Sequence, residues 1–108
     1  MRWRRRSAKV GGADRGELRA QAQEVASHLE EFVRSRVGVE AYVEPPTSVL
    51  PRTVVLVATD GEWTRRRVPD DAVLRHLADD LVVPVYDARI TGYPQRMRDW
   101  TARRRAQG

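Results

Sequence analysis

The residues of this sequence best suited to a chemical task are an aromatic ring and two guanidinium groups that alternate along one segment. Trp63, Arg65 and Arg67 recur at every second position, which places them on one face of a β-strand. Such a face can stack nucleic-acid bases and bind phosphates. A structural interpretation stays open beside it: Trp63 covers a sheet edge, and the arginines lay their stems over apolar neighbours and protect that edge from unwanted pairing.

Both ends of the chain combine aromatic and arginine side chains in a similar way. The formal net charge is +5, and Lys9 is the single lysine among 20 basic residues. Mixtures of guanidinium and aromatic groups suit contact with phosphates, although a GC-rich coding genome also produces an arginine bias. The nucleic-acid-binding residues that we expect from these patterns are Arg2, Trp3, Arg4, Arg5, Arg6, Trp63, Arg65, Arg67, Arg96, Arg103, Arg104 and Arg105.

Motifs for enzymatic catalysis are missing from the sequence. It has no Cys, which removes thiol nucleophiles and thiolate metal ligands. No Ser lies in a Gly-x-Ser-x-Gly elbow, and the glycines match neither a phosphate loop nor a dinucleotide fingerprint. Carboxylates do lie at helical spacing from two histidines, but any solvated helix face shows this: Glu24 and Glu31 near His28, Asp79 and Asp80 near His76. We therefore expect no catalytic residue, no metal ligand and no cofactor.

A divalent-metal-dependent, nuclease-like enzyme is the catalytic alternative. The element order expected below is also that of the restriction-endonuclease-like core, which needs an acidic residue near the hairpin and an acidic-x-Lys triplet on the next strand. Asp60, Glu62 and Thr64 come nearest to this pattern. However, Asp60 lies in the turn itself and Thr64 supplies no ammonium group. A carboxylate site would otherwise draw on Glu17, Glu24, Asp60, Glu62 and Asp87.

The first element that must position these residues is a long amphipathic helix. Asp14 and Glu17 have the spacing of a capping box at its start. Apolar residues then recur at steps of three and four and form one stripe, which consists of Leu18, Ala22, Val25, Leu29 and Phe32. Gly38 suits a left-handed cap at the end of this helix.

Three strands follow the helix, and a hairpin joins the last two. Residues 39–44 alternate apolar and polar side chains, which predicts a half-buried strand. Residues 53–59 and 62–68 flank Asp60-Gly61, and a two-residue loop of this type favours a type I′ turn. That loop pairs Thr59 with Glu62 and places Trp63, Arg65 and Arg67 on the face of Ala58, Leu56 and Val54.

The rest of the chain predicts a helix, a strand and a short final helix. Pro69-Asp70-Asp71 starts the first of these, and its buried face consists of Val73, Leu74, Leu77, Ala78 and Leu81. Residues 82–86 read as a strand that Pro84 restricts to an edge. After a turn at residues 91–94, a helix from about Pro94 holds Met97 and Trp100 on one side, exposes Arg96, Arg103 and Arg104, and frays at its end.

These elements predict a single small α+β domain of order α-β-β-β-α-β-(α), with its sheet built around the Asp60-Gly61 hairpin. We expect a flexible basic arm over residues 1–13, the domain over residues 14–102, and a basic tail over residues 103–108. The longest apolar run, Val54 to Ala58, is far shorter than the ~20 residues of a membrane-spanning helix. We expect no membrane span and a cytoplasmic protein.

Three stretches carry a resemblance to other proteins: Val37–Pro45, Asp60–Arg67 and Gly92–Asp99. They resemble small uncharacterised arginine-rich proteins of high-GC actinobacteria, over most of residues 14–102. The resemblance implies no function. From the residues alone we expect a non-catalytic module that binds RNA, a ribonucleoprotein or DNA. A protein-interaction module or a homodimer through a sheet edge is the other non-catalytic alternative.

Overall fold

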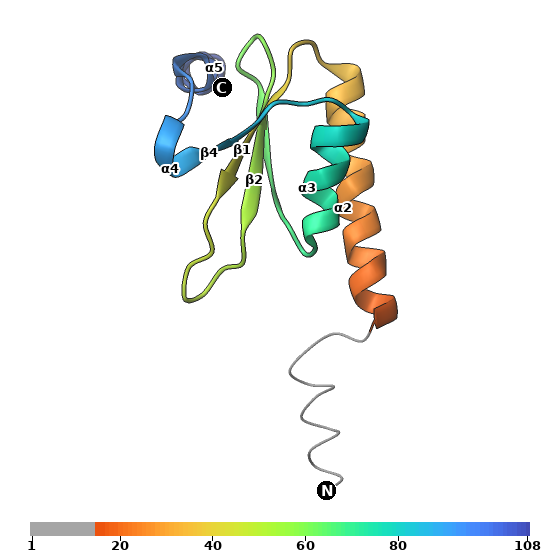
Figure 1. The fold of residues 1–108 in the computed structure, drawn as a ribbon. Helices are drawn as coiled ribbons and strands as arrows, with labels where there is room; N and C mark the ends of the chain where they lie inside the picture. The colour runs from red at the N-terminus through yellow and green to blue at the C-terminus, as the bar shows by residue number, and fades with distance from the viewer. Residues whose placement is uncertain (1–14) are drawn as a thin grey trace, which may run out of the picture.

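The computed structural model describes residues 15–108, which form an α+β domain with a four-stranded mixed sheet (Figure 1). The sheet order is β3-β2-β1-β4, with β1 parallel to β4 and the other pairs antiparallel. The strands are β1 (Glu40–Glu44), β2 (Thr53–Val57), β3 (Trp63–Arg67) and β4 (Val85–Asp87). The helices are α2 (Arg15–Ser35), α3 (Asp71–Arg75) with the π-helical turn η1 (His76–Asp80), α4 (Ala88–Thr91) and α5 (Gln95–Gln107).

Helix α2 confirms the expected amphipathic helix. Leu29 and Phe32 of its stripe are buried, and Ala22 and Val25 pack against the core. Leu18, one turn from the start of α2, is 44% exposed because this end extends beyond the sheet. Gly38 has a φ of 63° and ends the helical region in the left-handed conformation expected of it.

Both faces of the sheet are covered, which the alternating pattern of β1 did not predict. On one face, α2, α3 and η1 bury Ala41, Val54 and Leu56. On the other face, Tyr42 and Val55 pack with Ala88 of α4 and with residues at the start of α5. The expectation of a half-buried first strand was therefore wrong. The face of β1 that carries Tyr42 borders a second, smaller core, because the C-terminal segment folds over it.

The hairpin has a three-residue loop instead of the expected two-residue loop. The Ala58 N–H donates to the Glu62 carbonyl, and the Gly61 N–H donates to the Ala58 carbonyl. Gly61 has a φ of 96°, the left-handed residue that such a loop requires. The register therefore shifts by one residue, so that Trp63, Arg65 and Arg67 pair with Val57, Val55 and Thr53. The predicted partners Ala58, Leu56 and Val54 were wrong, and the three residues lie on the face that the C-terminal segment covers.

The second helical region begins as expected and then widens. The Asp70 side chain caps α3 by accepting a hydrogen bond from the Ala72 N–H. Val73 and Leu77 are buried, whereas Ala78 is exposed, contrary to expectation, because η1 has a wider turn than an α-helix. Strand β4 begins at Val85, three residues later than expected, and it lies at a sheet edge as Pro84 indicated.

Helix α5 continues through Gln107, well past the predicted domain boundary at residue 102. The Arg103–Arg105 cluster is therefore helical and not a tail. Helix α4, which precedes α5, replaces part of the expected turn because Asp87 caps it through the Arg89 N–H. Among residues 15–108, no helix combines the length and the apolar character that crossing a bilayer requires.

Candidate nucleic-acid interface

Trp63 joins β3 to α5. Its indole Nε1 donates a hydrogen bond of 3.0 Å to Thr101 Oγ1, and its side chain packs against the smaller core, as those of Tyr93 and Met97 do. The Arg65 guanidinium carbon lies 5.4 Å from the centre of the same ring. Trp63 is thus a half-buried support between strand and helix. Its N–H is already satisfied by α5, and one neighbour of its ring is an arginine.

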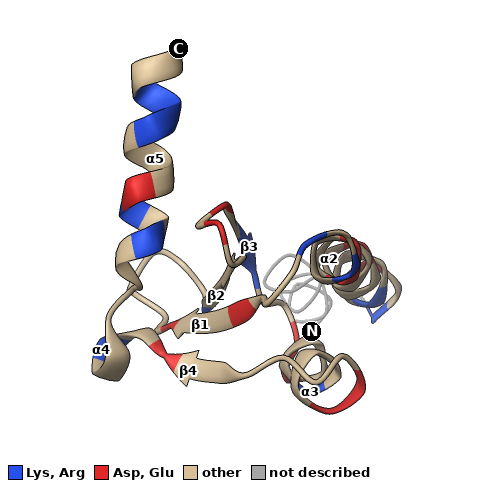
Figure 2. Ribbon diagram, turned by 90° about the horizontal axis from the view of Figure 1, so that it is seen from above, with Lys and Arg blue, Asp and Glu red and all other residues tan. Residues whose placement is uncertain are grey.

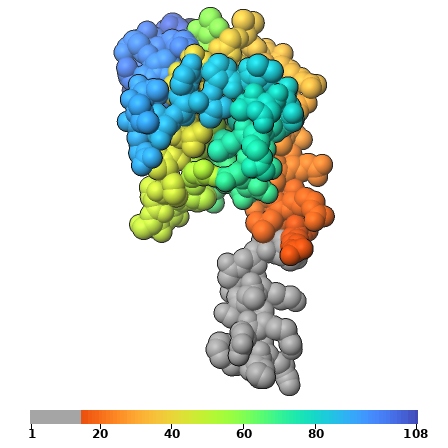
Figure 3. Space-filling view, in the orientation of Figure 1, coloured from red at the N-terminus to blue at the C-terminus, as the bar shows by residue number. Residues whose placement is uncertain are grey.

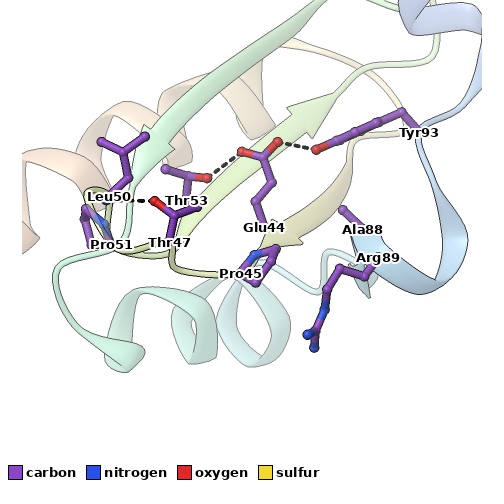
Figure 4. Close-up of a pocket in the computed structure, with 9 residues that line it drawn as sticks. All are labelled: Glu44, Pro45, Thr47, Leu50, Pro51, Thr53, Ala88, Arg89 and Tyr93. Atoms are coloured by element: carbon purple, nitrogen blue, oxygen red, sulfur yellow. Dashed lines mark hydrogen bonds between the residues drawn. The ribbon is translucent and has the colours of Figure 1, made fainter.

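Arg65 is held by a carboxylate. Its Nε and Nη2 donate to the two oxygens of Glu44 at 2.9 and 3.0 Å. Thr53 and Tyr93 also donate to Glu44, which lies at the edge of a hollow of about 340 Å³ (Figure 4). Burial favours a raised pKa for Glu44, but the hydrogen bonds from Arg65, Thr53 and Tyr93 outweigh it and hold that pKa below its usual value. The charge of Arg65 is therefore balanced within the chain.

Arg96 was expected on an exposed side of its helix and is instead half-buried against the sheet. Its Nε donates to the Ala58 carbonyl at 3.0 Å, and its Nη2 donates to Glu40 at 2.5 Å. The guanidinium lowers the pKa of Glu40. Burial, together with the hydrogen bond to Glu40, raises the pKa of Tyr42 to about 12. Arg96 therefore fixes α5 to β1 and the hairpin.

Gly61 allows this close approach of α5 to the hairpin. A Cβ at position 61 would lie 2.0 Å from the Arg96 carbonyl oxygen and 2.9 Å from the Trp100 Cβ. One turn later, Arg103 Nη2 donates to the Asp60 carbonyl at 3.0 Å. The backbone of α5 and the hairpin tip are therefore in direct contact, and the contact needs a residue without a side chain.

Several exposed arginines on β3 and α5 have no carboxylate partner among residues 15–108. Arg66 contacts the Arg65 carbonyl and His28, and the Arg104 guanidinium stacks on Trp100 at 5.2 Å. Arg105 lies one turn beyond Thr101 on α5. Arg67 lies at the other end of β3 from the hairpin, where it lines a hollow with Leu18 and Val25 of α2. We call Arg66, Arg67, Arg103, Arg104 and Arg105 the basic strip. Figure 2 shows basic residues on β3 and α5 and acidic residues at the end of η1.

The structure brings together only part of the predicted interface. Trp63, Arg65, Arg67, Arg96, Arg103, Arg104 and Arg105 lie on β3 and α5, although Arg65 and Arg96 form ion pairs there. The predicted residues Arg2, Trp3, Arg4, Arg5 and Arg6 lie outside the described residues. Sequence reasoning missed Arg66, because alternation assigned it to the opposite face. Arg66 does lie on that face, beside His28 of α2, and it is exposed because β3 is an edge strand, a position that the sequence does not reveal.

Three of the carboxylates of the nuclease alternative, Asp60, Glu62 and Asp87, have structural partners. Asp60 Oδ1 accepts the Glu62 N–H, and both oxygens of Glu62 accept hydrogen bonds from Arg36. Asp87 pairs with Arg89. Within residues 15–108, no group of three or more His, Asp or Glu side chains is arranged to hold a metal ion.

The two histidines connect elements instead. His28 Nε2 lies 3.1 Å from Thr64 Oγ1 and links α2 to β3, and burial and Arg66 lower its pKa. The ring nitrogens of His76 lie 2.7 Å from Asp80 and 2.9 Å from Glu30. These two carboxylates raise the pKa of His76 and make it a bridge between η1 and α2.

Comparison with known proteins identified no relative of this chain. No protein-family model, no curated protein and no solved structure matches the chain.

Proposed function

We propose that this protein is a non-catalytic binding module that contacts the phosphate backbone of nucleic acid through the basic strip, with RNA or a ribonucleoprotein favoured over DNA. The observation that supports it is the contact between Trp63 and Thr101. This contact joins β3 and α5, the two elements that carry the basic strip. Within it, Arg66 and Arg67 lie toward α2, and Arg103 lies at the hairpin tip. The arginine-rich residues 2–6 would add further phosphate contacts, and the proposed location is the cytoplasm.

The ion pairs divide the described arginines into two groups. One group is neutralised by carboxylates, and the other has no carboxylate partner there. Carboxylates neutralise Arg36, Arg65 and Arg96, which hold elements together. The basic strip lacks such partners within the described chain, so its charge remains available to phosphates, although Arg66 and Arg103 each use one donor on a main-chain carbonyl. Nothing in this geometry reads base edges, and the expected binding is therefore independent of sequence.

The salt dependence of binding gives the expected size of the effect. Each phosphate that is neutralised on a single strand contributes about 0.7 to the slope of log affinity against log salt. The five arginines of the strip would therefore contribute a slope of about −3.5 if each met one phosphate. Removing three of them should reduce the magnitude of the slope by about 2.

The experiment is a fluorescence-anisotropy titration of labelled single-stranded RNA, single-stranded DNA and both duplexes against the full chain, at several salt concentrations. The test variant replaces Arg66, Arg67 and Arg105 by Gln, because none of these pairs with a carboxylate in residues 15–108. The control variant replaces Arg15, Arg19 and Arg75, which lie on α2 and α3 and likewise appear in no ion pair there.

The two variants lose the same formal charge, so their difference isolates position from net charge. We expect the strip variant to lose affinity and slope on every nucleic acid that binds, while the control keeps most of both. Absence of binding at low salt, or equal losses in the two variants, would show that the strip is not the interface. Tighter binding of RNA than of DNA is expected from the proposed partner, and the reverse order would replace RNA by DNA.

A further inference from the structure

The two edges of the sheet differ in chemistry. At one edge, β3 carries three consecutive arginines, Arg65–Arg67, and charge of this kind protects an open strand from pairing with another chain. At the other edge, β4 presents Val85 and Tyr86, each 37% exposed. The β4 edge therefore lacks the charged side chains of the β3 edge, and its shortness and the preceding Pro84 limit any pairing to a few residues.

Exposed apolar side chains gather around β4. Val82 is 77% exposed and Ile90 is 82% exposed, so that half of the large exposed apolar side chains among residues 15–108 fall within residues 82–90. The segment that contains β4, cyan to light blue in Figure 3, lies uncovered across the front of the molecule. We call Val82, Val85, Tyr86 and Ile90 the β4 patch. A patch of this kind on a surface marks an interaction site.

Val82 ends the second helical region in the left-handed conformation. Its φ is 54°, a region that β-branched residues disfavour. The conformation turns the chain so that the Val83 N–H donates to the Leu77 carbonyl at 2.9 Å and the Val83 side chain is buried in the core. The side chain of Val82 itself is left in solvent, next to β4.

The main chain of β4 also offers unpaired groups. The Ala41 N–H donates to the Pro84 carbonyl at 2.9 Å, and Tyr86 is paired with Tyr42 in the parallel ladder. Pro84 and Tyr86 therefore use their main-chain groups toward β1. Since these groups alternate in direction along a strand, the N–H and C=O of Val85 point away from the sheet. They are available to a further strand.

We propose that the β4 edges of two copies of this chain pair antiparallel about a two-fold axis at Val85, forming one continuous sheet. Identical strands are self-complementary about such an axis, which places each Tyr86 opposite the partner's Pro84. Charge favours a second copy as the occupant. The charged groups that share a hollow with Val85 and Tyr86 are paired within one chain: Asp87 with Arg89 at 3.2 Å, and Arg52 with Asp71. The arginines of β3 lie at the opposite edge of the sheet.

The arrangement would place the two basic strips at the two ends of the joined sheet. The β3 strands are then separated by seven interstrand spacings of about 4.8 Å, or about 34 Å. A single long nucleic-acid strand that reaches both strips would bind with the avidity of two linked sites. This consequence alone depends on the proposed function, whereas the pairing of β4 edges does not.

Sedimentation velocity on the full, nuclease-treated chain tests the pairing, from micromolar to near-millimolar concentration. We expect a monomer-dimer equilibrium for the natural sequence, and a monomer throughout for Val85→Lys, because a charge at the centre of the joined edges opposes pairing. Val37→Lys is the matched control, since Val37 is 79% exposed outside the β4 patch. This control should dimerise as the natural chain does.

Circular dichroism checks that each variant is folded, and Val82→Lys, at a position already exposed, replaces Val85→Lys if the latter unfolds. A natural chain that stays monomeric, a Val85→Lys chain that still dimerises, or open-ended assemblies would each overturn the proposal. Because nucleic acid is absent, a dimer that later fails to bind RNA or DNA leaves the pairing intact and removes only the proposed function.

Discussion

Replacing Gly61 by Ala tests the contact on which the interface depends. The substitution is small, but the position combines two restrictions. Gly61 has a φ of 96°, and an added Cβ would lie 2.0 Å from the Arg96 carbonyl oxygen. The atom in the way is main chain of α5, so it cannot rotate aside as the end of a flexible side chain can. Helix α5 or the hairpin must move.

The size of the effect follows from these two contributions. A left-handed conformation costs an L-residue about 1–2 kcal/mol, and forcing extra atoms into a packed contact costs about 1–3 kcal/mol. Gly61→Ala should therefore reduce the free energy of unfolding by about 2–5 kcal/mol, a large part of the ~5–15 kcal/mol typical of a domain.

Gly92→Ala is the matched control. Gly92 also has a positive φ, 67°, but a Cβ there would have no atom within 4 Å. Its ψ of −172° lies in a region that glycine alone readily adopts, so only a conformational cost of about 1–3 kcal/mol applies to it. Urea denaturation followed by circular dichroism measures both variants, and Trp63 and Trp100 report on the contact by fluorescence. If Gly61→Ala is no more destabilising than Gly92→Ala, the close approach of α5 to the hairpin is refuted.

Three further substitutions test the polar contacts. Two carboxylates raise the pKa of His76, so its protonation stabilises the fold below about pH 6.5, and this stability is lost as pH rises through the folded pKa. His76→Gln should remove that loss. Urea denaturation between about pH 5 and pH 9 measures it. His28 has a lowered pKa and the opposite sign: its neutral form favours folding, and His28→Gln should remove a loss of stability that appears as pH falls below about 6.5. Glu44→Gln should reduce the free energy of unfolding by about 1–3 kcal/mol. It should also release Arg65, so that the folded variant binds RNA with a steeper slope of log affinity against log salt. An unchanged or shallower slope would contradict the role of that ion pair.

Local patterns predicted most elements of the fold. The stripe from Leu18 to Phe32 predicted α2, and the β-branched run at Thr53 predicted β2, because each pattern reports one element burying one face. The register of the hairpin was wrong because Asp60-Gly61 fits both two-residue and three-residue loops. The choice depends on where Gly61 meets α5, a contact between segments about 35 residues apart in sequence.

The interface was less predictable than the fold because ion pairing is a tertiary property. Nothing near Arg65 or Arg96 in the sequence indicates that Glu44 and Glu40 will neutralise them. Both partners lie on β1 and face the C-terminal segment only after the chain has folded over the sheet. Arg105 was expected in a tail and lies instead on α5, where it is exposed, as is Arg67 on β3.

The most direct test of the basic strip is an NMR titration that observes the Nε–H signals of the arginines while single-stranded RNA is added. The expected result is that Arg67 and Arg105 shift and broaden with the RNA, while Arg75, on α3, keeps its position. Arg65 should stay close to its initial position because Glu44 holds it. Shifts confined to arginines of α2 and α3, or no shift in β3 and α5 at saturating RNA, would contradict binding through the strip.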